Sequence, residues 1–291
     1  MKGVGEQQDY GQRIYDPRMG KFLSEDPLSK SYPELTPYQF ASNTPISGID
    51  RDGLEYYYNS DGVKIGSIDG STEVRRMNSD VTLSQAQNIF SKAHNNPYTM
   101  NANSTDVGMT NAELNVRALL TTIRKTEGHG VLTPYNKRYG GFTFDPAKGH
   151  PGTFLFKELQ LDKNGNIKRG IDGKALTHMV PHSPAGAFQI TEPTFNGYKK
   201  AWGLTNFLPP VQERVAMEKI KDRNAFYDVE TGNWNMAIPK LKNEWSSFPG
   251  GKGQAMTLDE ILQEIQNNIR NEINDKSSLA TPKGKLVPNK P

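Results

Sequence analysis

Apolar positions follow helical spacing most clearly near the middle of the chain. Thr110, with Glu113 three residues later, has the pattern of a capping box, in which each side chain bonds the other residue's backbone N–H. Gly128 supplies a stop signal. Between these points apolar side chains recur at intervals of three and four residues, at Leu114, Val116, Leu119, Leu120 and Ile123. The pattern predicts a helix over residues 111–127.

Further elements follow this helix. Residues 158–171 contain an Asn164-Gly165 turn between two strand-like runs, which predicts a β-wing that projects from the body. The last residues, 276–291, are polar and proline-containing, and we expect them to be disordered. Amphipathic spacing predicts four more helices, at 193–202, 210–223, 234–245 and 258–274. The predicted fold class is α+β, with a mainly helical domain at residues 110–275.

The N-terminal part has a different pattern. Residues 1–54 are dense in turn formers, such as YDPRMG and DRDGL, which break helices and permit only short strands. Residues 55–109 open with YYYNSDGVKIGSIDG, whose alternation around Asp61-Gly62 predicts a hairpin. A polar stretch with a short helix near residues 83–93 follows. We interpret residues 55–109 as a linker with a hairpin.

Composition narrows the classes of function. The 291 residues include 34% hydrophobic positions and no cysteine, which argues for one core with loose ends and excludes disulfides, thiol catalysis and thiolate metal sites. No apolar run approaches the roughly 20 residues of a membrane helix, and residues 1–20 lack a signal-peptide pattern. We therefore expect no membrane insertion, and export from the cytoplasm by a secretion system that needs no classical signal peptide. The net charge of +3 is too small to select an anionic polymer.

Glu127 is the sharpest candidate for chemistry. It lies one helical turn beyond Ile123, so a carboxylate occupies a position on the apolar stripe. Burial there disfavours the charged form and raises the pKa, as a general acid near neutral pH requires. Because the helix ends at Gly128, the side chain can open onto a cleft. The alternative is a last-turn glutamate that points into solvent.

Residues 111–254 resemble the phage lambda type of endolysin, a lysozyme-like lytic transglycosylase. Five stretches carry the resemblance in the family's order: RALLTTIRKTEGHG, YNKRYGGFTFDPAKGHP, SPAGAFQITEPTF, WGLTNFLPPVQERVAMEKI and NEWSSFPGGKGQ. The resemblance implies a lysozyme-like fold and places the family's catalytic glutamate on Glu127. Ordinary glycosidases need two carboxylates. A lytic transglycosylase manages with one, because the muramic acid's own 6-hydroxyl attacks and leaves a 1,6-anhydro end.

Further substrate contacts follow from these stretches. Gln189 can hydrogen-bond an acetamido or hydroxyl group, Tyr139 can stack on a sugar ring, and His150 can orient substrate. Asp145 is the candidate for a second carboxylate, and if it faces Glu127 the outcome becomes hydrolysis. The structural alternatives are that Gln189 caps a turn, with Phe188 and Ile190 in the core, that Tyr139 anchors packing and that His150 bonds the wing. Three positions depart from the family's pattern, at Ala187, Phe188 and Lys252.

A zinc pair is the other possible site. His178 and His182 are four residues apart, but Pro181 between them breaks a helix and no zincin glutamate accompanies them. We expect neither a metal nor a cofactor.

The first 54 residues resemble the conserved end of the RHS-repeat core of polymorphic bacterial toxins. The stretches are DYGQRIYDPRMGKFLSEDPL and SYPELTPYQFASNTPISGIDRDGLE. In that family a shell of repeats encloses a C-terminal toxin, and the chain cuts itself after the closing leucine. The resemblance implies a cut between Leu54 and Glu55, with Asp50 and Asp52 as participants. Arg51 replaces the family's proline, and this chain lacks the repeats that build the shell.

Together the two resemblances imply a peptidoglycan-degrading toxin that cleaves the MurNAc–GlcNAc bond in the periplasm or cell wall. The expected partners are glycan strands, a cognate immunity protein and the remainder of an RHS shell. One alternative is a hydrolytic muramidase. Another, which the departures at Ala187, Phe188 and Lys252 favour, is an inactive glycan-binding or interaction module. A nuclease would need a histidine-rich metal motif or a strongly basic face, so we expect no nucleic-acid partner.

Overall fold

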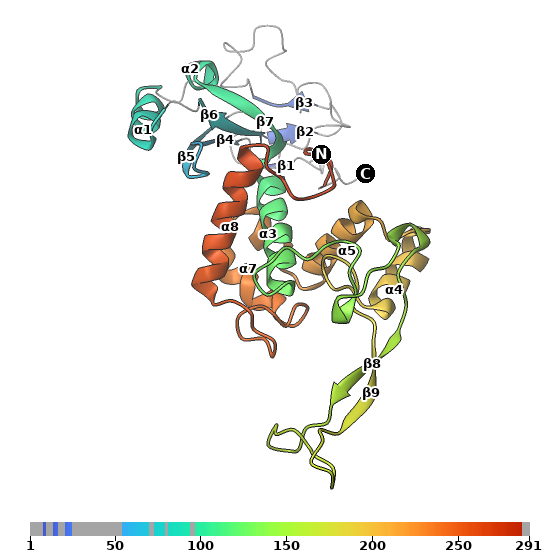
Figure 1. Cartoon of the computed structure of the whole chain (residues 1–291). Helices are drawn as coiled ribbons and strands as arrows, with labels where there is room; N and C mark the ends of the chain where they lie inside the picture. Colours follow the sequence, from blue (N-terminus) through green and yellow to red (C-terminus); the bar gives the residue numbers. More distant parts are fainter. Residues whose placement is uncertain are drawn as a thin grey trace, which may run out of the picture.

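A long central helix organises the molecule, of which the computed structural model describes residues 8–9, 14–16, 21–24, 54–69, 73–78, 81–93 and 97–286. The central helix, α3 (Asn111–Glu127), has the predicted bounds, and every residue from Glu113 to Arg124 is buried. The last long helix, α8 (Leu258–Ile273), runs beside it (Figure 1). A helix covered on all sides must satisfy its polar side chains within the protein.

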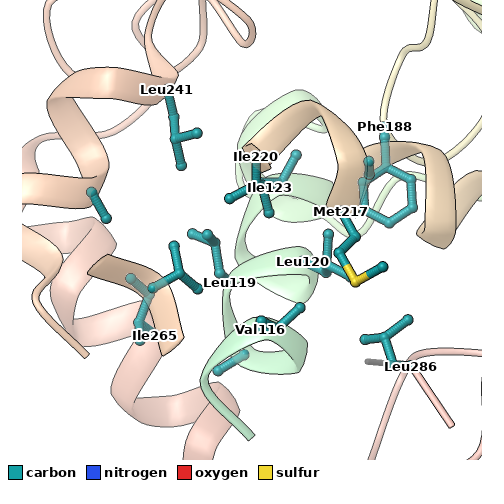
Figure 2. Close-up of a cluster of buried hydrophobic side chains, with 14 of the residues drawn as sticks. Val116, Leu119, Leu120, Ile123, Phe188, Met217, Ile220, Leu241, Ile265 and Leu286 are labelled. Carbon is teal, nitrogen blue, oxygen red and sulfur yellow. The ribbon is translucent and has the colours of Figure 1, made fainter. Parts of the chain in front are cut away.

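The main core surrounds α3. Figure 2 shows Val116, Leu119, Leu120 and Ile123 of this helix meeting side chains from several other elements. Those partners are Met217 and Ile220 of α5 (Pro209–Asp222), Leu241 of α7 (Trp234–Leu241), Ile265 of α8, and Phe188 and Leu286 from segments outside the helices. The apolar stripe that predicted the helix is therefore the centre of the core.

The remaining helices follow the predicted pattern with small differences. The helices α4 (Glu192–Trp202), α5 and α8 begin and end within one residue of the predicted bounds. Helix α7 ends at Leu241, four residues early, and continues as turns. A helix of five residues, α6 (Phe226–Glu230), was not predicted because it is too short to repeat an apolar period.

The described residues between 54 and 110 form a second folded layer, so the interpretation of residues 55–109 as a linker is wrong. The predicted hairpin is present as β4 (Leu54–Tyr58) and β5 (Lys64–Asp69), and the predicted helix is α1 (Leu83–Lys92). However, β4 also pairs in parallel with β6 (Glu73–Met77), which pairs with β7 (Ser104–Thr110) to give the order β5-β4-β6-β7. Together with α2 (Pro97–Ala102), these elements enclose a small core around Tyr57, Ile68, Met77 and Met100.

This sheet lies at one end of α3 and α8 (Figure 1). Strand β7 runs directly into α3. Gln266 of α8 and its C-cap residue Asn274 donate side-chain hydrogen bonds to the β4–β5 turn, at Gly62 O and Ser60 O respectively. Strands β6 and β7 alternate buried apolar residues with exposed or half-buried polar ones, so this part of the segment has the composition of a linker.

The β-wing is present but its strands pair differently from the prediction. The Asn164-Gly165 turn forms, with the Gly165 N–H bonded to Asp162 O. The regular ribbon, however, joins β8 (Phe154–Leu159) to β9 (Thr177–His182), and residues 166–171 make only isolated bridges. Pro181 is tolerated in β9 because both strands of a two-stranded ribbon are edges. The wing projects from the helical body (Figure 1).

The predicted disorder after residue 275 is wrong for residues 276–286. Gly284 and Leu286 donate backbone N–H bonds to the Glu113 carboxylate, and Leu286 is only 4% exposed. The Glu113 side chain therefore turns to this segment and not back to Thr110, although Thr110 caps α3 by accepting from the Glu113 N–H. Only half of the predicted capping box forms. Residues 287–291 lie outside the described residues.

The described N-terminal pieces are short strands, as predicted for residues 1–54. They are β1 (Gln8–Asp9), β2 (Ile14–Asp16) and β3 (Lys21–Phe22), which pair antiparallel in that order. Asp50 and Asp52 lie outside the described residues, and Leu54 is the first residue of β4. The α+β fold class is confirmed. Within the described residues, no helix has both the length and the apolar character that crossing a membrane demands.

Arg117 of α3 bonds this helix to α8 and to the C-terminal segment. The side chain is 1% exposed, and its Nε lies 2.8 Å from Glu272 Oε2 of α8. It also donates to Thr281 O and to Ser277 Oγ, each at 2.8 Å, and Nη1 lies 3.5 Å from Glu113 Oε1. Removing the guanidinium leaves two carboxylates buried without their cation.

We therefore expect Arg117→Ala to lower the free energy of unfolding by about 3–5 kcal/mol. Urea denaturation followed by circular dichroism measures the change. The control is Lys174→Ala, which removes a cation from an exposed ion pair with Asp172 and should change stability by less than about 0.5 kcal/mol. Equal shifts for both variants would contradict the role assigned to Arg117.

Candidate active site

Glu127, the last residue of α3, lies half-buried at the end of the core. Ser247 Oγ donates a hydrogen bond to Glu127 Oε1 at 2.5 Å. The other carboxylate oxygen, Oε2, receives no hydrogen bond from the residues that the structure describes. One oxygen is thus held by the protein while the other can meet a ligand.

The surroundings of Glu127 favour its protonated form. Burial raises the pKa of the carboxyl above the ordinary glutamate value, while the Ser247 hydrogen bond and the nearby His129 act in the opposite direction. The burial effect is the larger. The raised pKa agrees with the prediction from the apolar stripe, and it suits a group that must donate a proton near neutral pH.

The loop after α3 fixes the position of Glu127. A Cβ on Gly128 would lie 1.8 Å from Val131 O, so no larger residue fits there without a shift of the backbone. The loop closes through hydrogen bonds from the Thr133 N–H to Arg124 O and from the Val131 N–H to Gly128 O. The glycine predicted to end the helix is therefore also needed because the backbone of the following loop packs closely against it.

Ser247 is a site residue that the sequence interpretation missed. It is 5% exposed and lies in the turn-rich segment after α7, where its carbonyl accepts from the Ala255 N–H. The neighbouring Trp245 donates from Nε1 to Phe188 O at 3.1 Å, which joins this segment to residues 185–190. The signal available for Ser247 was its position in the NEWSSFPGGKGQ stretch of the family resemblance, because a serine hydroxyl there can bond the catalytic carboxylate.

The 185–190 segment packs into the core on one side and offers Gln189 on the other. Ala187 and Phe188 are buried, so these departures from the family's pattern serve packing. Gln189 has a left-handed φ of 47° and donates from Nε2 to Gly186 O at 2.9 Å, as the turn-capping alternative proposed. Its Oε1 is the amide atom left for a ligand.

His150 is engaged on both ring nitrogens. Nδ1 accepts from the Gly152 N–H at 3.1 Å and Nε2 lies 2.9 Å from Ile190 O, which fixes the neutral tautomer with a proton on Nε2. The ring stacks on Phe195, and burial lowers the pKa of the imidazole. These contacts favour a structural role for His150, although the ring joins the 150–152 turn to the 185–190 segment and does not bond the wing strands.

Tyr139 lies against the wing strands, and Asp145 is exposed on the surface. The Tyr139 ring stacks on His182 at 4.1 Å between centroids, and its hydroxyl donates to Glu158 Oε1 at 3.1 Å. Asp145 Oδ1 accepts from the Ala147 N–H at 3.0 Å and caps the one-turn helix Pro146–Lys148. No contact joins Asp145 to Glu127 within the described residues.

The two histidines that suggested zinc lie on β9, where His182 Nε2 is 2.7 Å from Glu158 Oε1. The two histidines are four residues apart on a strand, so they do not form the pair on a helix that the zinc hypothesis required. Among the residues that the structure describes, no three histidine, aspartate or glutamate side chains gather in a way that could hold a metal ion.

Comparison with known proteins places this site in a family. Residues 117–270 match the Endolysin family model, and this range spans α3 to α8. The chain is 30% identical over 132 residues to the endolysin of Escherichia phage lambda, which covers 45% of this chain and 69% of the relative. The chain belongs to the Endolysin family. The family match includes Glu127 and Ser247, whereas the β4–β7 layer lies before it.

Two further comparisons accompany this assignment. The endolysin of Escherichia phage P2 is 40% identical over 58 residues, covering 20% of this chain and 35% of that relative. The solved structure of bacteriophage lambda lysozyme complexed with a chitohexasaccharide is 25% identical, with a TM-score of 0.41, and covers 53% of this chain and 94% of its own. Endolysin membership supports a peptidoglycan-degrading, lysozyme-like function for this chain.

The raised pKa of Glu127 has a consequence for stability. In the unfolded chain a glutamate titrates near about 4.3. Because the folded pKa is higher, the stability that the protonated carboxyl contributes is present below that value and is lost as pH rises through the folded pKa. We expect Glu127→Gln to have a higher Tm than the unmodified chain at pH 7, with the difference disappearing near pH 4. Thermal unfolding at a series of pH values measures this.

Glu260 provides a control of opposite sign. Hydrogen bonds from the Thr257 backbone and hydroxyl lower the pKa of this exposed capping-box carboxyl. Its stabilising effect is therefore present at neutral pH and is lost as pH falls. We expect Glu260→Gln to lower the Tm at pH 7. A lower Tm for Glu127→Gln at pH 7 would contradict the account of a buried, destabilising carboxylate.

Proposed function

We propose that this chain cleaves the MurNAc–GlcNAc bond of peptidoglycan as a lytic transglycosylase, with Glu127 as its proton-transferring residue. The observation that carries the proposal is the half-buried Glu127 carboxyl, whose pKa is raised and whose Oε1 is held by Ser247. Membership of the Endolysin family supports the substrate class. Glycan strands are the proposed partner, with Gln189 Oε1 and the exposed Tyr139 as contacts.

A single carboxyl accounts for both halves of this reaction. Protonated Glu127 donates from Oε2 to the glycosidic oxygen as the bond to the muramic acid C1 breaks. The 6-hydroxyl of the same sugar then attacks C1 and gives its proton to Glu127, which regenerates the acid and leaves a 1,6-anhydro ring. Proton transfer of this kind contributes about 100-fold to 10,000-fold in rate. Ser247 acts as a positioning residue, because its bond to Oε1 directs Oε2 toward the substrate.

The hydrogen bonding of Asp145 favours transglycosylation over hydrolysis. A hydrolase needs a second carboxylate to activate water or to attack the sugar. Asp145 is exposed, accepts from the Ala147 N–H, and has no contact with Glu127 within the described residues. We therefore propose that it caps its short helix and takes no part in the chemistry.

The test is clearing of purified cell walls by the full chain. We expect Glu127→Gln to reduce the rate by at least about 100-fold, because the amide cannot donate and recover a proton. Glu260→Gln is the matched control and should clear at the rate of the unmodified chain. Mass spectrometry of the fragments should show 1,6-anhydro ends.

Each other outcome identifies an alternative. Equal clearing by Glu127→Gln and the unmodified chain would remove Glu127 from the mechanism. Reducing ends in place of anhydro ends would identify a hydrolytic muramidase. Binding to walls without clearing by either protein would identify an inactive glycan-binding module.

We further propose that the enzyme is a toxin delivered behind an RHS core and released by a cut between Leu54 and Glu55. The cut would fall inside β4 and would remove only Leu54 from the strand, so Glu55–Tyr58 and every later element would stay on the released chain. Glu55 is buried and accepts from the Tyr57 hydroxyl at 2.6 Å, so the new N-terminus would start inside the sheet. A cognate immunity protein would protect the producing cell, and the target wall would be that of a competitor.

Intact mass measurement of the expressed chain tests this release. We expect a product that begins at Glu55, and we expect the double change Asp50→Ala with Asp52→Ala to leave the full-length chain. The control is Asp61→Ala, an acidic residue on the β4–β5 turn, which should not prevent the cut. A stable full-length product from the unmodified chain would contradict the proposed cut.

A further inference from the structure

Exposed apolar side chains are concentrated on the wing, residues 154–182, compared with the other parts of the chain that the structure describes. Of eighteen large hydrophobic residues that are exposed among the described residues, seven lie between Phe154 and His182. Three are on the strands and four are on the outer part, residues 160–176, which we call the wing tip. The four are Leu161, Ile167, Ile171 and Leu176. An apolar cluster on a projecting element indicates a contact surface.

The same tip carries an excess of positive charge. Lys163, Lys168, Arg169 and Lys174 outnumber Asp162 and Asp172, which gives a net charge of +2 over seventeen residues. Ile171 is fully exposed, at 112% of its reference area, between Arg169 and Lys174. Lys174 and Asp172 form an ion pair, but both side chains are solvent-exposed, so each charge remains accessible to a binding partner.

The residue types at the tip distinguish between classes of partner. Protein interfaces are enriched in aromatic residues, methionine and arginine, and are depleted in lysine. The tip contains no aromatic residue and no methionine, but three lysines among aliphatic side chains. Lysine and aliphatic residues together suit an anionic lipid surface, since the aliphatic groups enter the boundary below the headgroups while the ammonium groups stay at the phosphates.

Several backbone groups of the wing tip are already hydrogen-bonded within the protein, as contact with a lipid surface requires. The Lys168 N–H bonds to Gln160 O, the Leu176 N–H to Lys168 O and the Gln160 N–H to Leu176 O. These bonds join three chain segments, so their polar groups need not lose water partners on entering an apolar layer. The wing also extends away from the helical body, which leaves the tip free to reach a surface (Figure 1).

We propose that the wing tip docks this protein on anionic phospholipid surfaces. The contact is peripheral and is made by the wing tip. It involves no residue of the Glu127 site, so it stands or falls separately from the proposed glycan cleavage.

Sedimentation of the full chain with lipid vesicles tests the proposal. We expect binding to vesicles that contain phosphatidylglycerol, weakening with added salt, and no binding to pure phosphatidylcholine. The triple change Lys168→Gln, Arg169→Gln and Lys174→Gln should lower the affinity on the order of a hundredfold. The matched control is Lys199→Gln, Lys200→Gln and Lys242→Gln, which removes the same charge from exposed positions on the body and should bind normally.

A second measurement reports insertion directly. The chain has no cysteine, so Ile171→Cys introduces a single thiol for an environment-sensitive dye. We expect its emission to shift to the blue on phosphatidylglycerol vesicles, while a dye on Lys199→Cys should not change. Unchanged wall clearing by the tip variants would show that they are folded.

Three results would overturn the proposal. The first is no vesicle binding by the unmodified chain. The second is an equal loss of binding in the tip and body variants, which would indicate general attraction of a basic protein. The third is vesicle binding with no spectral change at position 171, which would place the contact elsewhere.

Discussion

The burial of α3 on all sides is the constraint on which the rest of the structure depends. Its buried stretch includes Glu113, Arg117 and Arg124, and charged groups in such a place need partners. Those partners come from distant parts of the sequence. Arg117 bonds α8 and residues 277–282, Glu113 accepts from residues 284–286, and Arg124 bonds Thr133 O and Ser278 O. The charges that burial makes costly thus fasten the C-terminal segment and the loop beside Glu127.

This dependence explains which parts of the fold were predictable from sequence. The bounds of α3 follow from local signals, because Thr110 caps its first turn and Gly128, where a Cβ would meet Val131 O, marks its end. Residues 276–286 offer no such signal. They have no apolar period of their own, and they are ordered by hydrogen bonds to Glu113 and Arg117, more than 150 residues earlier. A composition that indicates disorder in isolation is here fixed by partners that only the tertiary structure supplies.

The same distinction applies to the wing and to the candidate site. The Asn164-Gly165 turn formed as predicted, but the longer pairing of β8 with β9 determined the ribbon. Glu127 was detectable because its anomaly, a carboxylate on an apolar stripe, can be recognised within one helix. Ser247 shows no such local anomaly, because it is 120 residues away and its hydroxyl has meaning only beside that carboxylate. Its place in the NEWSSFPGGKGQ stretch was the signal available for it.

The two influences on Glu127 oppose each other, and that opposition suits a single-carboxylate mechanism. Burial alone would keep the carboxyl protonated and make it a poor base, whereas an exposed glutamate would be ionised at neutral pH and a poor acid. Here burial raises the pKa, while the Ser247 hydrogen bond and His129 limit the rise. A carboxyl balanced in this way can give a proton and take one back within one turnover. In the proposed transglycosylation no water or second carboxylate shares that work, so the balance has to reside in this one residue and its immediate neighbours.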